Sequence, residues 1–336
     1  MMMDRLRGIG WVMLVAVFAL TGCRDKPRFD WDLDAAPPAS AGASGAVQAP
    51  EAPTQDAEGA PLRFISHNVE NWLSMRRNVD GRTLEDAPKP DEEKSALITM
   101  IARHQPDVLG LSEIGTPDDL AEIRSRLRDA GVDLPHLHHH HGSDSVRALG
   151  LLSRYPITAA SASADTAFRL GGRRFEMLRG ILDATVATPD GREFRFLGVH
   201  FKSKRETPQY DQAQFRIQEA HRLRGHIDAI LNADSDARLV VFGDLNDTRR
   251  SQVVTLIAGS FGFGRQLFPV PARDSNRQMW THHWRYQDVY SRIDYIFITE
   301  TLRAEADLDS ARVIDDREWR SASDHRPLLL DFRPAR

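Results

Sequence analysis

Apolar and polar positions along the chain follow two different periods, and each period predicts one kind of element. Short stretches dominated by apolar and β-branched residues predict buried strands. These stretches lie at residues 62–68, 108–112, 148–152, 157–168, 177–186, 194–201, 238–242, 293–298 and 328–332. From about residue 61 onward, the predicted strands alternate with predicted helices.

Helical spacing of apolar residues predicts the intervening helices. The segment 91–104 carries acidic residues in its first turn and apolar residues at helical spacing, and it stops before a proline. Thr116 and Pro117 predict another helix start, as N-cap and first helical residue. The segment 208–231 predicts a long amphipathic helix. Its expected apolar face consists of Ala213, Ile217, Ala220, Leu223 and Ile227. Together these elements predict an α/β sandwich in which helices cover packed sheets.

Polar side chains stand at the ends of the predicted strands. The run Gly243-Asp244-Leu245-Asn246-Asp247 follows the apolar strand at 238–242. Gly, Asp and Asn are also the residues of ordinary turns, so this run alone leaves a turn and a functional site equally open. Further polar groups at strand ends are Asn68, Glu70, Glu113, His200, Asp294, Asp324 and His325. Convergence of these clusters on one edge of the sandwich would create a single site rich in carboxylates.

The side-chain chemistry of that set is coherent. Carboxylate and amide oxygens without cysteine favour Mg²⁺, Mn²⁺ or Ca²⁺ over zinc. Such a hard cation polarises a phosphoryl oxygen and stabilises the charge of an in-line transition state. Histidines with neighbouring carboxylates can transfer protons or hold phosphate oxygens. The set is therefore compatible with a metal-assisted attack of water on a phosphoryl group.

Six motifs, in this order, resemble those of the endonuclease/exonuclease/phosphatase superfamily, whose members are deoxyribonuclease I-like. The motifs are Asn-Val-Glu, Leu-Ser-Glu, Val-His-Phe-Lys-Ser-Lys, Gly-Asp-Leu-Asn-Asp, Arg-Ile-Asp-Tyr-Ile and Ser-Asp-His-Arg-Pro. The resemblance covers residues 61–334. It implies a four-layered α/β sandwich of two packed mixed β-sheets flanked by helices. It also implies a phosphoester hydrolase that uses Mg²⁺ or Mn²⁺, with Ca²⁺ as an alternative.

The resemblance also implies roles for the matching residues around the metal and the attacking water. Glu113 would be the main metal ligand, with Asn68 and Asp324 near the metal. Asp244 would orient or deprotonate the water. Asn246 would hold the phosphate or the water.

A second group of matching residues is implied to contact the phosphate. His325 would bind the scissile phosphate and would be oriented by Asp294. His200 would face the phosphate from the other side, as in the nuclease and sphingomyelinase branches. Arg179 and Lys202 are further expected phosphate contacts.

The chain departs from the common pattern of the superfamily at two positions. Ser112 stands where many relatives have Gln, and His67 stands where Trp is common before the asparagine. Neither change removes an implied ligand, and Glu70 occupies a position where the family often has an acidic residue near the metal. The departures favour a bacterial secreted subgroup over a DNA-repair enzyme.

The N-terminus predicts a lipoprotein signal. Two arginines precede an apolar run at 8–20, which is shorter than the ~20 residues of a membrane-spanning helix but suits a secretory signal. The sequence Leu-Thr-Gly-Cys ending at Cys23 resembles a lipobox, so residues 1–22 are the expected signal peptide and Cys23 the lipidated residue. Because Arg24 follows, we expect an outer-membrane anchor facing the periplasm. The alternatives are a plain signal peptide with an incidental cysteine, and a surface or secreted protein.

Composition refines the expected organisation and partners. Residues 23–60 are rich in Ala, Pro, Gly and Ser and predict a linker, which leaves 61–336 as the catalytic domain. The formal net charge is −4, or −5 without residues 1–22. This charge argues against non-specific coating of nucleic acid but permits a local basic patch. The expected partners are a phosphoester substrate, nucleic acid included, and the membrane; no protein partner is implied, and a monomer is expected.

Two charged or titratable runs leave alternatives open. Lys202, Lys204 and Arg205 could form a solvated face, but their place directly after His200 favours phosphate contact. The histidine run at 136–141 could bind Zn²⁺, Ni²⁺ or Cu²⁺ adventitiously. We expect it to be a loop or a strand edge without a catalytic role.

The leading hypothesis is a nuclease or phosphodiesterase acting on nucleic acid or nucleotide-like substrates. The second is a phospholipid or sugar-phosphate phosphatase or phosphodiesterase, which a membrane anchor would suit. The third is a non-catalytic binding lipoprotein, which the retained ligand set disfavours. Four aromatic residues could stack bases or meet lipid, although core and rim packing is the more common use. They are Trp280, Trp284, Tyr286 and Tyr290.

Overall fold

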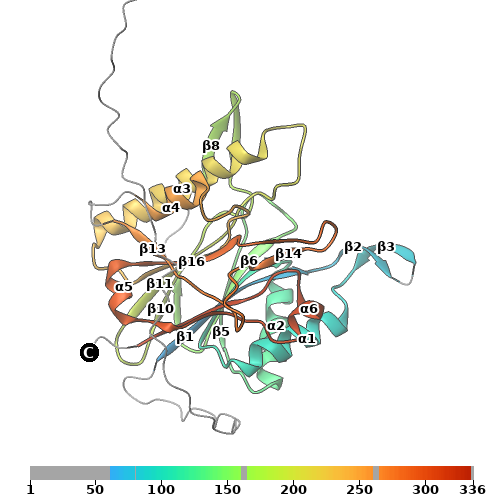
Figure 1. The fold of residues 1–336 in the computed structure, drawn as a ribbon, viewed down its shortest axis with the longest axis horizontal. Helices are drawn as coiled ribbons and strands as arrows, with labels where there is room; N and C mark the ends of the chain where they lie inside the picture. Colours follow the sequence, from blue (N-terminus) through green and yellow to red (C-terminus); the bar gives the residue numbers. More distant parts are fainter. Residues whose placement is uncertain (1–60, 80, 160–164, 260–264, 334–336) are drawn as a thin grey trace, which may run out of the picture. The chain divides into compact units, whose positions relative to one another are not determined.

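The computed structural model describes residues 61–79, 81–159, 165–259 and 265–333. The expected signal peptide, the expected lipidation site Cys23 and the expected linker at 23–60 lie outside these residues. Two six-stranded sheets form the centre of the described region (Figure 1). Among the described residues, no helix combines the length and the apolar content needed to cross a membrane.

The first sheet is mixed and has the order β17-β18-β1-β4-β6-β5. Its central strands β1 and β4 are parallel, and each of its other neighbouring pairs is antiparallel. The strands are β17 (Ala306–Val313), β18 (Leu328–Phe332), β1 (Leu62–Trp72), β4 (Val108–Ile114), β6 (Ala148–Ser153) and β5 (His136–His140). The histidine run thus forms the edge strand β5, as expected from the sequence.

The second sheet has the order β13-β16-β12-β11-β10-β7 and is also mixed. Its central strands β11 and β12 are parallel, and β16 runs antiparallel to β12. The strands are β13 (Leu267–Pro269), β16 (Asp294–Thr299), β12 (Leu239–Asp244), β11 (Glu193–His200), β10 (Leu182–Ala187) and β7 (Ile157–Ala159). Each sheet therefore has a parallel pair at its centre.

Apolar side chains from the facing sides of the two sheets form one continuous core. The ring of Phe64 on β1 lies 5.0 Å from that of Phe196 on β11 and 5.1 Å from that of Phe242 on β12, measured between centroids. Gly110 on β4 is required here, because a Cβ atom would collide with the Phe242 ring. Close packing of this kind fixes the spacing of the two sheets.

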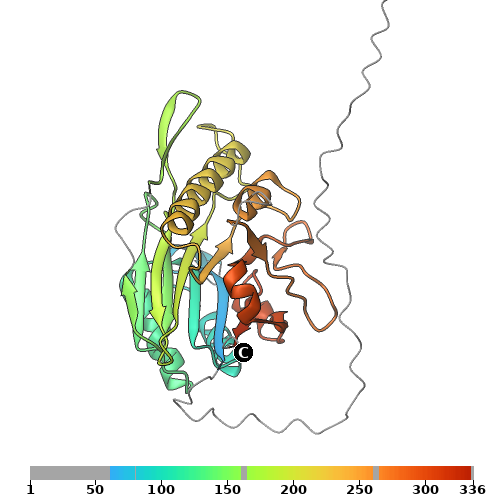
Figure 2. The same cartoon turned by 90° about the vertical axis from the view of Figure 1, so that its left-hand side faces the viewer.

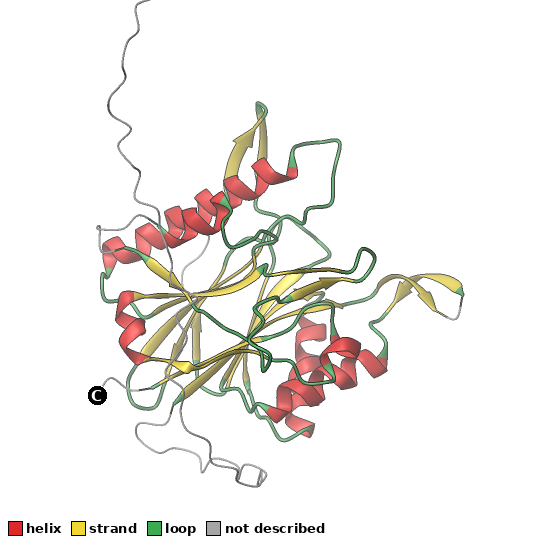
Figure 3. Cartoon of the chain, in the orientation of Figure 1, coloured by secondary structure: helices red, strands yellow, loops and turns green. Residues whose placement is uncertain are grey.

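Helices cover the outer side of each sheet (Figure 3). A second apolar core joins the first sheet to α1 (Asp91–Arg103), α2 (Pro117–Asp129) and α6 (Trp319–Ala322). Along the second sheet run α3 (Gln212–Ala233) and α4 (Gln252–Ala258), as Figure 2 shows, and α5 (Glu300–Glu305) connects β16 to β17. The order helix, sheet, sheet, helix is the expected four-layered α/β sandwich.

Three hairpins extend from the layers (Figure 1). They are β2 (Met75–Val79) with β3 (Arg82–Ala87), β8 (Ala167–Leu170) with β9 (Arg173–Glu176), and β14 (His282–Trp284) with β15 (Val289–Ser291). The β14–β15 hairpin reaches the ends of the central strands through a bridge between His282 and His325.

For two of the predicted strands, the predicted extent was wrong in part. The segment 157–168 is not one strand, because β7 ends at Ala159 and β8 begins at Ala167, with 160–164 outside the described residues. In the segment 177–186, only the part from Leu182 onward is strand. Gly180 has φ of 67°, a left-handed conformation that interrupts extended backbone. Apolar composition alone did not reveal either break.

The long helix expected at 208–231 is present, but it is shifted at both ends and runs from Gln212 to Ala233. It begins at Gln212 rather than at residue 208, because Asp211 caps it by accepting hydrogen bonds from the amides of Ala213 and Gln214. Ala213 is exposed and not part of the apolar face. By contrast, the predicted cap at Thr116 is confirmed, with a reciprocal capping box to Asp119.

Candidate active site

Polar strand ends from both sheets meet at one edge of the sandwich. The parallel pair β1 and β4 carries Asn68 and Glu113 to this edge, and the parallel pair β11 and β12 carries His200 and Asp244. His200 is paired in register with Asp244, and Asp244 with Asp294 on β16. The topology thus brings together residues that are far apart in the sequence, as the pattern of strand ends predicted.

The amide of Asn68 lies at the centre of this cluster. Its Nδ2 donates to Glu113 Oε1 at 3.2 Å and to Asp244 Oδ2 at 3.3 Å, and it lies 3.5 Å from His325 Nε2. Asn68 and Asp244 are almost fully buried. One amide therefore joins a carboxylate of the first sheet to a carboxylate of the second.

The two histidines approach this centre with different partners. His325 Nδ1 lies 2.8 Å from Asp294 Oδ2, so the carboxylate fixes the orientation of the ring. Its Nε2 faces Asp244 Oδ2 at 3.8 Å. His200 Nε2 lies 3.7 Å from Glu113 Oε1 and 3.6 Å from Asp244 Oδ2. Both rings thus point an Nε2 atom toward the same acidic centre.

Burial and charge set the protonation state of His325 and its partners. Burial opposes the charge of His325, but the ion pair with Asp294 outweighs it and raises its pKa well above 6.5. Burial opposes ionisation of Asp294 as well, and His325 reverses this effect and lowers the pKa of Asp294. For Asp244, burial and the charge of Asp294 raise the pKa to about 8.

His200 has the opposite electrostatic environment. Burial lowers its pKa well below 6.5, and the nearby positive charges of Arg179 and His325 lower it further. Its Nδ1 is buried and has no hydrogen-bond partner within the described part of the chain. His200 is therefore a neutral imidazole at neutral pH, whereas His325 is charged.

The loop after β12 has a backbone conformation specific to this site. Gly243 has φ of 128°, and a Cβ atom there would collide with the Val199 carbonyl oxygen. Asn246 has φ of 50°, and its amide nitrogen donates to Asp244 Oδ1 at 2.7 Å. Its side chain donates to the Phe201 carbonyl at 3.0 Å and to Asp244 Oδ2 at 3.2 Å. Asn246 thus holds the carboxylate of Asp244 in place.

Asp247, which the sequence alone could not assign, fixes this loop. Its Oδ2 accepts from Arg216 Nε at 3.3 Å, and its Oδ1 accepts from the Thr248 amide at 2.9 Å. Glu113 also adopts a left-handed conformation, with φ of 66°. Non-glycine residues in such conformations cost about 1–3 kcal/mol each and are concentrated at functional sites.

The donor set fits a hard divalent cation. Carboxylate oxygens of Asp244 and Asp294 lie within 4.8 Å of one another, as do ligand atoms of His282 and Asp324. His325 lies within the same distance of both pairs, but a charged imidazole has no free lone pair for a cation. Asp244 also shares the Asn68 amide with Glu113, the ligand expected from the sequence. Several buried carboxylates in one place repel each other unless a cation or protons compensate their charge.

Asp324 lies at the rim of the cluster and Glu70 behind it. Asp324 Oδ1 is 3.8 Å from His325 Nε2, and its amide nitrogen donates to Glu70 Oε2 at 2.8 Å. Lys89 Nζ in turn donates to the Glu70 carbonyl oxygen at 3.1 Å. Glu70 therefore contacts the site through the Asp324 backbone.

Two residues of the site were missed by sequence reasoning. The ring of His282 lies 4.6 Å from that of His325, and its Nε2 is 3.6 Å from Asp324 Oδ2. Arg147 Nε lies 4.0 Å from Glu113 Oε2. His282 lies in a short polar strand and carries no apolar strand-end signal. Arg147 directly precedes the apolar strand β6, so its place at a strand start could have revealed it.

The two expected phosphate contacts, Arg179 and Lys202, have different partners in the structure. Arg179 is buried, and its Nε lies 3.1 Å from Asp144 Oδ2. Its positive charge lowers the pKa of His200. Lys202 Nζ donates within its own loop, to the carbonyl oxygens of Ser203 and Arg205 and to Ser203 Oγ. The Lys202 amide donates to the fully buried Glu219 at 2.7 Å.

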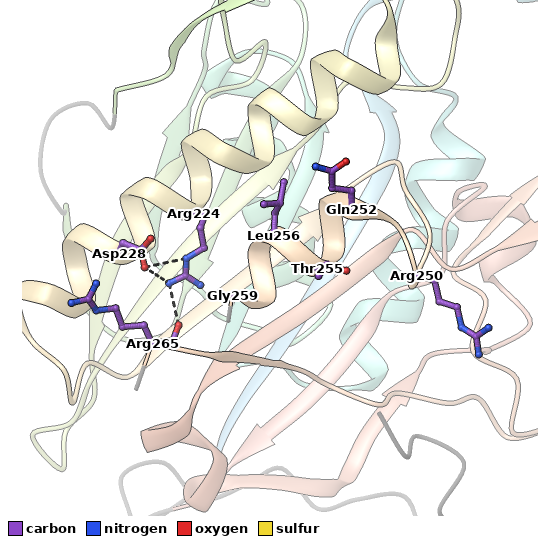
Figure 4. Close-up of a pocket in the computed structure, with 8 residues that line it drawn as sticks. All are labelled: Arg224, Asp228, Arg250, Gln252, Thr255, Leu256, Gly259 and Arg265. Carbon is purple, nitrogen blue, oxygen red and sulfur yellow. Dashed lines mark hydrogen bonds and ion pairs between the residues drawn. The ribbon is translucent and has the colours of Figure 1, made fainter. Parts of the chain in front are cut away.

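A separate hollow of about 630 Å³ lies beside α3 and α4 (Figure 4). None of its eight lining residues belongs to the strand-end cluster. Arg224 in its wall is bound to Asp228 Oδ1 at 2.7 Å and to the carbonyl oxygens of Ile257 and Arg265. This guanidinium is already satisfied, so the hollow is not the candidate active site.

Comparison with known proteins agrees with this geometry. A model of the endonuclease/exonuclease/phosphatase family matches residues 78–325. The human Nocturnin catalytic domain has a similar structure at 20% identity and a TM-score of 0.56, covering 81% of this chain and 94% of that one. Truncated Caenorhabditis elegans TDP2 also has a similar structure, at 15% identity and a TM-score of 0.55, covering 81% of this chain and 97% of that one.

A further similar structure is beta toxin from Staphylococcus aureus, at 15% identity and a TM-score of 0.54, covering 80% of this chain and 99% of that one. No curated protein sequence matched. At these identities the structural matches show the fold, and the family match covers most of the chain. The chain belongs to the endonuclease/exonuclease/phosphatase family.

Proposed function

We propose that the chain is a divalent-metal-dependent phosphodiesterase that hydrolyses nucleic acid or nucleotide-like phosphodiesters. The observation that carries this proposal is the pair of histidines whose Nε2 atoms both face Asp244 Oδ2, at 3.6 Å for His200 and at 3.8 Å for His325. A charged imidazole binds a phosphate oxygen, and a neutral one can accept or pass on a proton. The bound cation, Mg²⁺ or Mn²⁺, would stabilise negative charge on the phosphoryl oxygens.

Side chains of the cluster would bind the cation, orient the attacking water and transfer its proton. Glu113 and Asp244 would hold the cation, and Asp324 at the rim would assist. Asn68 points its NH2 group at both carboxylates, so it would bind the cation only after rotating its side-chain oxygen toward it. Once the cation offsets the effects that raise the pKa of Asp244, this carboxylate, fixed by Asn246, would orient the attacking water and accept its proton. The OH of that water adds to phosphorus, the P–O bond to the leaving group breaks, and the proton ends on the leaving oxygen.

The phosphate would lie between the two histidines. His325 would donate from Nε2 to a phosphate oxygen, with Asp294 holding the other ring nitrogen at 2.8 Å. His200 would face the phosphate from the other side. The positive charge of Arg179 beside His200 supports an anion at this place, and contact of Lys202 with phosphate would require its ammonium to leave the loop carbonyls.

The test is a substrate panel assayed with the purified chain in Mg²⁺ and in Mn²⁺. The panel compares single-stranded DNA, RNA, sphingomyelin vesicles and phosphomonoesters, because the alternative hypotheses share the active-site residues. We expect hydrolysis of the nucleic acids, and loss of that hydrolysis in His325→Ala. Hydrolysis restricted to lipid or sugar phosphates would replace this proposal with the second hypothesis.

Two further outcomes would overturn the proposal completely. Folded enzyme that hydrolyses no phosphoester would indicate a non-catalytic binding protein. Activity unchanged in His325→Ala would mean that the hydrolysis comes from a contaminant or from another site. Circular dichroism of both proteins checks that the variant is folded.

A further inference from the structure

A hollow lined by aromatic and cationic side chains lies beside the candidate active site. Its volume is about 590 Å³, and none of the described residues that line it carries a carboxylate. The side chains that shape it are Trp280, His283, Arg285, Tyr290, Trp319 and Arg320. The hydrolytic reaction as described above uses none of these residues.

One strand separates this hollow from the phosphate site. Neighbouring residues on β14 face opposite ways, because side chains alternate along a strand. His282 contacts the ring of His325, whereas His283 faces the hollow, and its amide donates to the Asp324 carbonyl at 2.9 Å. Arg285 lies in the hollow wall with Nη2 3.8 Å from Glu70 Oε2. A ligand in the hollow would therefore be a close neighbour of a phosphate at His325.

The aromatic wall is held in a fixed arrangement. The Trp280 ring meets Tyr290 edge-on with centroids 4.8 Å apart, and it meets Trp319 in the same way at 5.2 Å. His283 stacks on Tyr290 at 4.1 Å with an interplanar angle of 3°, and Asp288 fixes its Nε2 at 2.9 Å. Flat side chains that are already ordered bind a flat ligand without a large loss of conformational entropy.

The wall also carries positive charge. The guanidinium of Arg320 lies 5.5 Å from the Trp319 ring centroid, and Arg285 Nη2 donates to the Arg320 carbonyl at 3.1 Å. Tyr290 remains 49% exposed, so its ring is accessible from solvent. Aromatic faces together with guanidinium groups complement a planar ring that is attached to phosphate.

We propose that this hollow is a substrate subsite that receives a base of a nucleotide chain whose scissile phosphodiester lies between His200 and His325. The inference rests on the proposed phosphodiesterase function and adds the place where a base of that substrate would bind. It assigns Tyr290 and Arg320 to base recognition and leaves hydrolysis to the strand-end residues.

The first experiment compares two single-stranded oligonucleotides with the same phosphates, one made of deoxyadenosine and one made of abasic residues. We expect Tyr290→Ala to raise KM for the adenine substrate about tenfold, as loss of one stacking contact predicts, with little change in kcat. KM for the abasic substrate should not change. Tyr290→Phe should restore the low KM.

Tyr286→Ala is the matched control, because Tyr286 belongs to the same hairpin connection and is 87% exposed but does not line the hollow. Its KM should match that of the unaltered chain. An equal change in KM for both substrates in Tyr290→Ala, or no change for either, would overturn the base subsite while leaving the hydrolytic proposal intact.

A binding measurement separates the two proposals if no substrate is hydrolysed. Adenosine monophosphate is added to the full chain without metal, and quenching of tryptophan fluorescence is followed. Saturable quenching that Tyr290→Ala weakens and Tyr286→Ala preserves supports the subsite independently of catalysis. Absence of saturable quenching would contradict it.

Discussion

At the scale of single residues, His200 and His325 have the same side chain but different charges at neutral pH. His325 has a carboxylate partner, Asp294, which raises its pKa. The buried Nδ1 of His200 has no hydrogen-bond partner among the described residues, and burial together with the charge of Arg179 lowers the pKa of the ring. The sequence identified both residues by their place at strand ends, but the charge difference depends on neighbours that only the fold brings together.

The ion pair between Asp294 and His325 leads to a first prediction. Asp294→Asn removes the charge that keeps His325 protonated, so we expect kcat to fall about 10²–10⁴-fold, the range of a lost acid–base or charge-stabilising contribution. Steady-state kinetics at pH 7 measure this effect. Asp309→Asn, at an exposed position on β17, is the control. A kcat within twofold of the unaltered value would contradict the assigned role.

Glu219 leads to a prediction on stability. Burial raises its pKa from 4.5 to about 7, although its bond from the Lys202 amide favours the charged form. The folded state therefore binds more protons than the unfolded state between pH 4.5 and 7. The free energy of unfolding should fall across this interval, by an amount on the order of 3 kcal/mol from this group.

Glu219→Gln should remove this contribution, so that the free energy of unfolding falls less between pH 5 and pH 8 than in the unaltered chain. Urea denaturation at the two pH values measures the difference. Glu193→Gln, at an exposed position, should retain the full decrease. Equal pH dependence in the chain with and without Glu219→Gln would show that this carboxyl ionises as freely as in the unfolded state.

At the scale of elements, the turn after β12 determines where Asp244 and Asn246 lie. Gly243→Ala would place a methyl group against the Val199 carbonyl oxygen at φ of 128°. We expect a loss of stability of about 2–4 kcal/mol, since both strain and displacement of the strand contribute. Thermal denaturation measures this loss.

Gly225→Ala is the matched control, because Gly225 lies within α3 and a Cβ atom there meets no other atom within 4 Å. It should leave stability unchanged or raise it by about 1 kcal/mol through helix propensity. If both variants melt at the same temperature, the conformation at Gly243 does not constrain the turn.

Elements with a strong local signal could be predicted from the sequence, and elements set by tertiary contacts could not. The cap at Thr116 and the strand β18 were predicted because their residues specify them locally. The apolar face of α3 was only partly predicted, because Phe215 packs on Phe168 and Phe175 of the β8–β9 hairpin, with ring centroids 4.8 and 5.6 Å away. Because the β8–β9 hairpin was not predicted from the sequence, the burial of Phe215 against it could not be predicted.

At the scale of the whole molecule, the candidate active site likewise combines residues with a local sequence signal and residues placed only by tertiary contacts. Its central residues were predicted because each stands at one end of an apolar strand. The far ends of parallel strands carry Asn68, Glu113, His200 and Asp244, and the starts of antiparallel strands carry Asp294 and His325 to the same edge. His282 and the aromatic wall around Tyr290 come from the β14–β15 hairpin, the loop before it and the short helix α6, where no periodic pattern exists. Their place beside the site follows from the β14–β15 hairpin bridging to His325.

The buried carboxylates predict a dependence on metal. Chelation with EDTA should abolish hydrolysis, and added Mg²⁺ or Mn²⁺ should restore it without refolding. Mn²⁺ should also raise the melting temperature by a few degrees, since a ligand that binds only the folded state stabilises it. Both effects should be lost in Glu113→Gln and kept in Glu92→Gln, at an exposed position of α1. Metal-independent hydrolysis would exclude the proposed cation.

The N-terminal signal gives a prediction for the full chain in a Gram-negative cell. We propose that Cys23 is lipidated, so the chain should incorporate labelled palmitate and fractionate with the outer membrane. Cys23→Ser should incorporate no label and should appear in the soluble fraction. Membrane association that persists without the label would indicate an anchor other than Cys23.

The position of Asn68 between the sheets bears on when the enzyme becomes active. Asn68 and Glu113 belong to the first sheet, whereas His200, Asp244 and Asp294 belong to the second. A folding intermediate with only one sheet formed therefore holds only part of the catalytic set. Under the proposed function, hydrolysis should therefore begin only when the two sheets dock, and a chain that has not yet completed this step should be inert.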